Sequence, residues 1–257
     1  MTELEAAIIA SKTTGEILRK AWGEQSNKVQ YKSPVDLVTE YDRKAEQVIA
    51  ELLYKYFPDY GFMAEEGTQG NDNQDVYWIV DPLDGTTNFS RRYPWFAISI
   101  ALVKNRKLLL GVVYNPINDE LFVGELGKGA TLNGQTIRVS GVNTIHQALL
   151  TSGFYYDTYL RSNRNIEKWM FAIQNAIGVR CDGSAALDLC SVACGRYDGY
   201  WEEGLDSWDV AAGALIVQEA GGLVTDYQGG DNYLFGKQIV AAPPSLHAEM
   251  LQYIVRS

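Results

Sequence analysis

The residues of this chain best suited to chemistry are acids that lie next to turn-forming residues. Asp81 and Asp84 stand three positions apart directly after an apolar run, and Pro82 stiffens the segment between them. Two such acids can point at one centre, where a divalent cation relieves their repulsion most simply. Ligands made only of oxygen favour Mg²⁺ or Mn²⁺ over zinc. Gly85 lets the backbone approach an anion, and Thr86 presents an amide at the start of a short helical turn, where phosphate oxygens bind well.

The same segment is also typical of an ordinary β-turn, because Asp, Pro and Gly all favour turns. Acids and turns elsewhere in the chain favour the chemical interpretation. Glu65 and Glu66 form an earlier acidic pair, residues 183–185 begin a later turn and helix, and Asp209 opens a helix beside small residues. We therefore expect four separate segments to converge on one site.

Composition excludes several other kinds of site. The chain has 257 residues, with 22 Lys and Arg against 32 Asp and Glu and a formal net charge of −10. Such a surface repels phosphate backbones, so no direct nucleic-acid partner is expected. Three cysteines and two histidines are too few for a disulfide framework, a histidine-rich zinc site or a catalytic triad. No apolar run approaches the roughly 20 residues that span a bilayer, and residues 1–15 lack the features of a signal peptide, so we expect a cytoplasmic protein without membrane contact.

Periodicity predicts the elements that must position these residues. Apolar residues at helical spacing predict two N-terminal helices, 4–22 and 39–56. Aromatic and branched residues then predict a largely antiparallel sheet with strands at 77–80, 96–103, 107–114 and 120–123. After about Val139 strands and helices alternate. The expected strands are 148–152, 223–225 and 238–241, and the expected helices are 165–175, 184–195, 207–220 and 245–255.

This change of pattern divides the chain into two layered halves, and the expected fold class is α/β (α+β). Residues 1–140 form an N-terminal α+β half that carries most of the candidate metal ligands. Residues 141–257 form a C-terminal α/β half with the loop 183–185 and Asp209. Nothing near 140–144 resembles a flexible linker, so the halves are expected to pack tightly as one unit.

Taken in order, these segments resemble the inositol monophosphatase family. The resemblance covers nearly the whole chain and is carried by KSPVDLVT at 32–39 with Asp42, the pair Glu65-Glu66, DPLDGTTNF at 81–89, WDVAAG at 208–213 and EAGG at 219–222. It implies a layered αβαβα sandwich of the sugar-phosphatase type, Mg²⁺-dependent hydrolysis of phosphomonoesters, sensitivity to lithium and a homodimer.

The resemblance also implies a set of metal ligands. Glu65, Asp81 and the backbone carbonyl of Leu83 would bind one Mg²⁺. A second ion would be bound by Asp81, Asp84 and Asp209. A third, weaker ion would again use Glu65, close to the loop of Lys32, and Mn²⁺ would be able to replace Mg²⁺.

The remaining roles implied by the resemblance concern water and substrate. Thr86 with Asp42 would orient and deprotonate the attacking water, and Glu66 would stand close behind the metal ligands as a further acid. The phosphate would lie on the amides of Gly85 and Thr86. The substrate's hydroxyls would meet groups from both halves, namely Asp84, Gly183, Ser184, Ala185, Glu202 and Asp209.

The substrate stays open among phosphomonoesters. Glu202 and Asp209 favour a polyol monophosphate such as myo-inositol 1-phosphate, because carboxylates accept hydrogen bonds from hydroxyls and would repel a second phosphate. Histidinol phosphate is the alternative, since its ammonium group would pair with Glu202 or Glu203; related proteins also act on fructose 1,6-bisphosphate and NADP. A hypothesis of another class is that the chain binds the transcription machinery, with which a bacterial family member associates.

Overall fold

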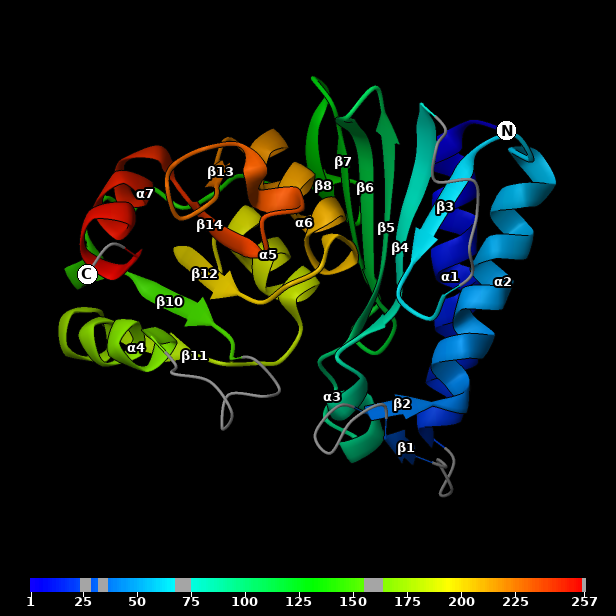
Figure 1. The fold of residues 1–257 in the computed structure, drawn as a ribbon, viewed down its shortest axis with the longest axis horizontal. Helices are drawn as coiled ribbons and strands as arrows, with labels where there is room; N and C mark the ends of the chain where they lie inside the picture. Colours follow the sequence, from blue (N-terminus) through cyan, green and yellow to red (C-terminus); the bar gives the residue numbers. More distant parts are fainter. Residues whose placement is uncertain (24–28, 32–36, 68–74, 155–163, 256–257) are drawn as a thin grey trace.

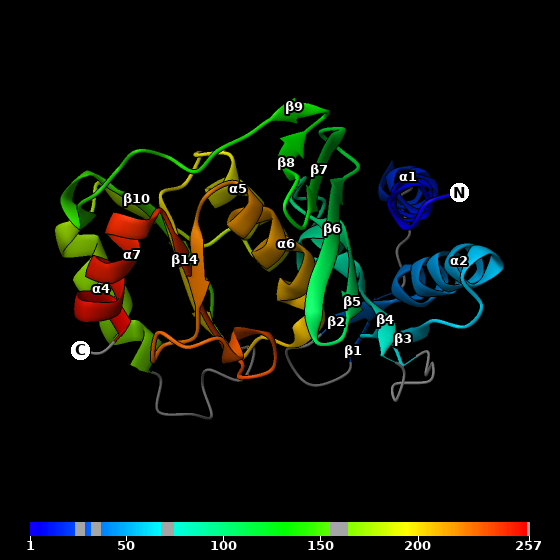
Figure 2. The same cartoon turned by 90° about the horizontal axis from the view of Figure 1, so that it is seen from above.

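The computed structural model describes residues 1–23, 29–31, 37–67, 75–154 and 164–255, and these fold into five layers (Figure 1, Figure 2). An outer helix pair, a seven-stranded sheet, an inner helix pair, a five-stranded sheet and a second outer set of helices follow one another. The α/β fold class and the αβαβα sandwich expected from the sequence are therefore confirmed. Within the described residues, no helix is both long enough and apolar enough to cross a membrane.

The first outer layer consists of α1 (Glu3–Gly23) and α2 (Glu40–Tyr56), which pack on each other and on the seven-stranded sheet. Both match the helices predicted from apolar spacing. The buried face of α1 is rich in small residues, among them Ala6, Ala7 and Ala10, so this helix lies close to the sheet. Asp42 lies in the first turn of α2 and is 1% exposed, which places an acid of the outer layer inside the molecule.

The seven-stranded sheet has the order β3-β4-β5-β6-β7-β8-β9. Its strands are β3 (Gly61–Ala64), β4 (Val76–Asp84), β5 (Ala97–Lys104), β6 (Lys107–Asn115), β7 (Glu120–Glu125), β8 (Gly129–Leu132) and β9 (Gln135–Thr136). Its neighbouring strands are antiparallel, as predicted, except that β3 and β4 run parallel at the edge. The carboxyl ends of β3 and β4 therefore meet at one end of the sheet.

The inner layer consists of α5 (Ala185–Ala193) and α6 (Ser207–Glu219), which are largely buried between the two sheets. Helix α6 approaches the first sheet closely at Gly111 of β6. A Cβ added at Gly111 would lie 2.6 Å from the backbone oxygen of Ala212, so only a glycine leaves room for the helix. At the last turn of α6, Glu219 accepts hydrogen bonds of 2.8 Å from the amides of Gly127 and Gly129. Glu219 of the EAGG motif therefore holds the turn between β7 and β8.

The five-stranded sheet has the order β11-β10-β12-β14-β13. Its strands are β10 (Leu149–Ser152), β11 (Gly178–Arg180), β12 (Gly199–Glu203), β13 (Leu223–Thr225) and β14 (Gln238–Ala242). Strand β10 is parallel to both β11 and β12, while β14 is antiparallel to β12 and β13. Helices α4 (Arg164–Asn175) and α7 (Pro244–Met250) form the outer layer on this sheet, and the predicted terminal helix ends in a π-helical turn (Leu251–Val255).

Several short elements are not predicted by the sequence. They are the antiparallel pair β1 (Val29–Tyr31) and β2 (Leu37–Thr39), the strands β3, β8, β9, β11 and β12, and 3₁₀ turns at Ile145–Gln147 and Asn232–Leu234. The short helix α3 (Thr86–Arg91) occurs where a helical turn was predicted. None of the missed elements is longer than five residues, which is too short for a hydrophobic period to be seen.

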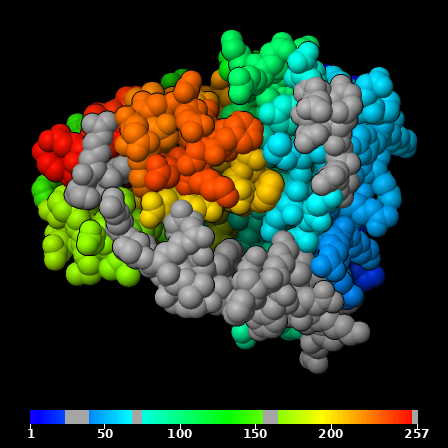
Figure 3. All heavy atoms as spheres, in the orientation of Figure 1, coloured from blue at the N-terminus to red at the C-terminus, as the bar shows by residue number. Residues whose placement is uncertain are grey.

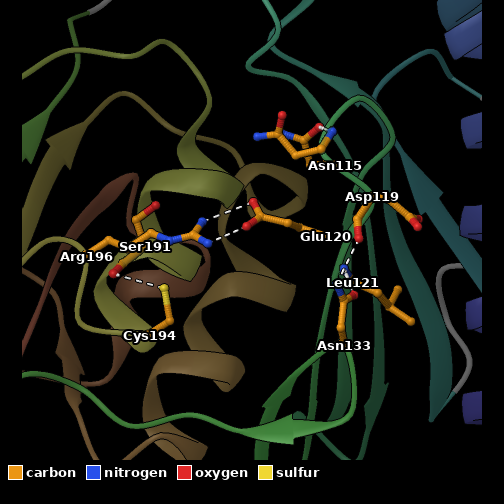
Figure 4. A network of polar contacts seen from close by, with 9 residues as sticks. Asn115, Asp119, Glu120, Leu121, Asn133, Ser191, Cys194 and Arg196 are labelled. Carbon is orange, nitrogen blue, oxygen red and sulfur yellow. Dashed lines mark hydrogen bonds and ion pairs between the residues drawn. The ribbon is translucent and has the colours of Figure 1, made fainter.

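A polar network joins the loop after α5 to β7 of the first sheet (Figure 4). The guanidinium of Arg196 donates two hydrogen bonds to the carboxylate of Glu120, one of them 3.0 Å long, and lies 6.0 Å from the ring centroid of Phe122. Figure 3 shows cyan residues of the N-terminal half adjoining yellow and orange residues of the C-terminal half on one face. The division into residues 1–140 and 141–257 stays a proposal; it would give each half one of the two large sheets, because β9 ends at Thr136 and β10 begins at Leu149.

Candidate active site

Acids from β3, β4 and α6 converge where β3 and β4 end. In this parallel pair Ala64 lies opposite Val80, so that Glu65 and Asp81 follow at the same level. Asp209 reaches the same place from the first turn of α6. Burial raises the pKa of Asp81 well above its ordinary value, and the charges of Glu65, Asp84 and Asp209 raise it further. Four of the acids predicted to bind metal are therefore close enough to repel one another.

A β-bulge turns Asp81 and Asp84 toward the same centre. Three residue steps on β4, from Asp81 to Asp84, match only two steps on β5, from Ser99 to Ala97. In a regular strand, residues three apart point to opposite faces, and one extra residue reverses that alternation. Pro82 lies inside the bulge, where its missing N–H costs no ladder hydrogen bond.

Hydrogen-bond donors of the protein orient the side chains of Asp81, Asp84 and Asp209. Asp81 is 2% exposed, and its Oδ1 accepts a 2.9 Å bond from the amide of Leu83. Asp84 is 8% exposed, and its Oδ2 accepts bonds of 2.6 Å from the Ser184 hydroxyl and 2.8 Å from the Ala186 amide. The loop before α5 therefore contacts Asp84, as the resemblance implied.

Burial opposes the charged form of these acids. It raises the pKa of Asp84 to about 6, although the bonds from Ser184 and from the amides of Ala185 and Ala186 act against the rise. Burial, followed by the charge of Asp84, raises the pKa of Asp209 well above its ordinary value. The amide of Asp206 partly compensates by donating a 2.6 Å hydrogen bond to Asp209 Oδ2.

The donor chemistry of this acidic group fits a hard divalent cation. Within the described residues, Asp81, Asp84 and Asp209 form no ion pair with Lys or Arg, so the protein itself leaves their repulsion uncompensated. Oxygen-only sites of this kind suit Mg²⁺. In the same part of the chain, no three Asp, Glu, His or Cys side chains already lie close enough to hold one ion.

Thr86 and Asp42 form a buried pair beside the acids. The Thr86 hydroxyl lies 2.8 Å from Asp42 Oδ1 and 3.0 Å from the backbone oxygen of Leu83, and it donates to one of the two at a time. This contact joins the start of α2 to the start of α3. Gly85 precedes α3 with φ +91°, where an added Cβ would also lie 3.0 Å from the Trp95 backbone oxygen, so only glycine suits this position.

The second acid of the Glu65-Glu66 pair contacts α2. The amide of Glu66 donates a 2.7 Å hydrogen bond to Glu46 Oε2, and Glu66 Oε2 lies 3.9 Å from Arg43 Nε. Glu46 is 2% exposed, so this contact anchors the segment after β3 to the outer layer. Lys32, which the resemblance placed near a third ion, lies outside the described residues.

Glu202 brings an acid of the second sheet near the acidic group. It lies near the carboxyl end of β12, and its Oε2 accepts a 2.8 Å hydrogen bond from the Tyr200 hydroxyl. Burial raises the pKa of Glu202 to about 7, and the nearby charge of Asp84 adds to the rise, while bonds from Tyr200 and the Gly153 amide oppose it. The predicted substrate acid is therefore close to the predicted metal acids.

Asn88 is a site residue to which the sequence analysis assigned no role. Its Nδ2 lies 2.7 Å from the backbone oxygens of Trp95 and Asp182 and 3.3 Å from that of Gly183. One amide thus holds the loop before α5 against the segment after α3. The feature of the sequence that could have identified Asn88 is its place inside the DPLDGTTNF run. Nothing in the sequence identifies its partners in the loop before α5, because they are distant along the chain.

Comparisons with known proteins cover the whole chain. A model described as the inositol monophosphatase family matches residues 1–257. The chain belongs to the inositol monophosphatase family. Nus factor SuhB of Pasteurella multocida (strain Pm70) is 40% identical to it over 253 residues, 98% of this chain and 95% of the relative. Inositol-1-monophosphatase of Synechocystis sp. is 41% identical over 252 residues, 98% of this chain and 88% of the relative.

A solved structure agrees with the sequence comparisons. Inositol monophosphatase from Anabaena (Nostoc) has a TM-score of 0.89 and 38% sequence identity, and the match covers 97% of this chain and 94% of that one. Members of the inositol monophosphatase family are metal-dependent phosphomonoester hydrolases, and this chain is a hydrolase of that class. A group of acids that a cation would stabilise, beside a hydroxyl paired with a buried carboxylate, suits that chemistry.

Proposed function

We propose that the protein hydrolyses a small phosphomonoester with Mg²⁺, and that its substrate is myo-inositol 1-phosphate. The observation that carries the proposal is the convergence of Glu65, Asp81, Asp84 and Asp209 beside the Thr86–Asp42 pair. The name of the Synechocystis relative, Inositol-1-monophosphatase, supports this choice of substrate.

Two to three Mg²⁺ ions are the proposed cofactors, with Mn²⁺ as a substitute. Glu65, Asp81 and the Leu83 carbonyl are the proposed ligands of one ion, and Asp81, Asp84 and Asp209 of another. Bound divalent cations neutralise phosphate charge, lower the pKa of water and stabilise a leaving oxygen. The repulsion among these acids supports the assignment, because a cation would relieve it. Lithium sensitivity is expected as for the family.

The chain's own groups are proposed to orient the water and the phosphate. Asp42 accepts the hydrogen bond of the Thr86 hydroxyl, whose oxygen is then free to accept one from the attacking water. Asp42 is the proposed acceptor of the proton that the water loses through this hydroxyl. The amides of Gly85 and Thr86 are proposed to hold the phosphate, and Glu66 to support the ligand Glu65 from behind.

Substrate hydroxyls are proposed to bind between the two halves. Their partners would be Asp84, Gly183, Ser184, Ala185, Glu202 and Asp209, as the resemblance implied. A carboxylate such as Glu202 accepts two hydroxyl hydrogen bonds, which suits a ring polyol. Histidinol phosphate is the alternative substrate, because its ammonium would pair with Glu202. Binding to the transcription machinery is a second candidate function, suggested by the relative named Nus factor SuhB.

We also propose a cytoplasmic homodimer that pairs through α4. Ile166, Met170 and Ile173 repeat at helical spacing along α4, and Ile177 follows it; these four side chains are between 51% and 68% exposed. An exposed apolar stripe of this length is typical of a protein–protein contact. A second copy of the chain is the proposed occupant.

The experiment that tests the activity is phosphate release by the purified protein with Mg²⁺ or with EDTA. Myo-inositol 1-phosphate, histidinol phosphate, fructose 1,6-bisphosphate and NADP are compared by kcat/KM. We expect inositol 1-phosphate to be the best substrate, with activity abolished by EDTA and by Asp81→Asn. Asp75→Asn, which removes an exposed acid just before the same strand, is the control and keeps full activity. Activity retained in EDTA or in Asp81→Asn contradicts the metal assignment.

A further inference from the structure

The carboxylate of Glu202 lies directly against backbone at the end of the neighbouring strand. Strands β10 and β12 are parallel, with Thr151 opposite Tyr200 and Ser152 opposite Trp201, so Gly153 follows at the level of Glu202. The Gly153 amide donates a hydrogen bond to the Glu202 carboxylate. A Cβ added at Gly153 would lie 2.3 Å from both carboxylate oxygens. The carboxylate thus occupies the space that a side chain at position 153 would need.

A buried amide holds this strand end in place from the outer layer. Asn165 lies at the start of α4 and is 1% exposed. Its Nδ2 is 2.5 Å from the backbone oxygen of Gly153 and 3.4 Å from the Ser152 hydroxyl. Its Oδ1 accepts a 2.8 Å hydrogen bond from the indole N–H of Trp201, the residue before Glu202. One side chain therefore ties the end of β10 to the end of β12.

These contacts hold the Glu202 carboxylate from two sides. Gly153 is held at its carbonyl by Asn165, so its backbone cannot withdraw from the carboxylate that its amide contacts. Tyr200, which is fully buried, fixes the second side of the carboxylate through its bond to Oε2. Trp201 points to the opposite face of β12 and is also fully buried, so the strand itself cannot rotate.

We propose that Gly153 and Asn165 are positioning residues that set where Glu202 receives the substrate's hydroxyls, and thereby select polyol monophosphates. This rests on the proposed role of Glu202 in substrate binding. Because Gly153 has no side chain, the Glu202 carboxylate fits against its backbone. Asn165 holds the Gly153 backbone at that distance from the carboxylate. Neither residue is among the proposed phosphate ligands, so both would act on recognition of the alcohol part of the substrate rather than on the hydrolysis step.

The test measures KM and kcat of Gly153→Ala with two substrates. Inositol 1-phosphate carries the hydroxyls that Glu202 would bind, and p-nitrophenyl phosphate carries none. We expect KM for inositol 1-phosphate to rise about tenfold or more, as for loss of a hydrogen bond to a charged group. The value of kcat and the KM for p-nitrophenyl phosphate stay within about twofold. A rise in KM with both substrates contradicts selection through the alcohol.

A matched control separates the effect of steric crowding in the sheet from the effect of moving the Glu202 carboxylate. Gly199 lies on the same sheet, and a Cβ there would lie 2.4 Å from the sulfur of Met250, in the core and away from Glu202. Gly199→Ala is expected to lower the melting temperature without changing either KM. Asn165→Asp keeps an acceptor for the Trp201 indole but removes the donor to Gly153, and it is expected to raise KM for inositol 1-phosphate only.

A double-mutant cycle with Glu202→Ala tests the positioning role of Gly153 separately from the substrate role of Glu202. If Gly153 acts through Glu202, Gly153→Ala raises KM for inositol 1-phosphate in the native background but adds nothing once Glu202 is truncated. An equal rise in both backgrounds overturns the positioning role while the substrate role of Glu202 stands. If Glu202→Ala alone leaves KM unchanged, the substrate role is wrong and the positioning proposal falls with it.

Discussion

Replacing Asp84 by asparagine should stabilise the metal-free protein while destroying its activity. The pKa of Asp84 is raised from 3.8 to about 6 by burial. At roughly 1.4 kcal/mol per pH unit, the difference of about 2 units means that the buried charge costs about 3 kcal/mol of stability. An asparagine oxygen keeps an acceptor for the Ser184 hydroxyl and the Ala186 amide, so Asp84→Asn removes the charge and retains these bonds.

The pH dependence has a defined sign. Between pH 3.8 and about 6 the folded protein holds a proton on Asp84 that the unfolded chain releases, so stability falls as the pH rises through this window. The loss reaches about half of its full value by pH 5 and is complete by about pH 8. The Asp84→Asn variant lacks this loss. Its advantage over the native protein should therefore grow from about 1.5 kcal/mol at pH 5 to about 3 kcal/mol at pH 8.

Urea unfolding in EDTA at pH 5, 6.5 and 8 measures this advantage, with Asp75→Asn as a control for removing an exposed charge. The control should track the native protein at every pH. Saturating Mg²⁺ should reverse the order, because the native protein gains the binding energy of an ion that the variant holds weakly. A variant less stable than the native protein at pH 8 in EDTA, or an advantage that does not change with pH, refutes the argument that a buried, uncompensated charge is present at Asp84.

Three further changes test the proposed chemistry, the packing and the dimer. Thr86→Ala should lower kcat by about 100-fold or more, because general acid–base assistance is worth roughly that much, and a change in KM alone in steady-state kinetics contradicts the water-orienting role. Gly111→Ala should cost about 1–3 kcal/mol in urea unfolding because its Cβ would crowd the Ala212 oxygen, whereas Gly141→Ala, with open space around it, should cost little. Met170→Glu should give monomers in light scattering, and a dimer that persists rules out pairing through α4.

The long elements and the identity of the acids are set by local sequence. Helices α1 and α2 have enough turns for an apolar stripe to recur, and β4 to β7 are long runs of branched and aromatic residues bounded by turn residues. The pair Asp81 and Asp84, with Pro82 between them, predicted a cation site once the acids Glu65, Glu66 and Asp209 elsewhere in the chain were considered with it. The short strands β3, β8, β9, β11 and β12 escaped prediction because they exist through pairing with other strands, not through a pattern of their own.

Tertiary structure decided what the acids do to one another. That Asp81 and Asp84 share a side depends on a bulge against β5, and that Glu65 joins them depends on the parallel pairing of β3 with β4. The sequence placed Glu202 among the substrate groups only through family resemblance. Its fixing by Gly153 depends on the register of two strands whose residues lie far apart in the chain, and such register is a property of the packed sheets, which no local pattern records.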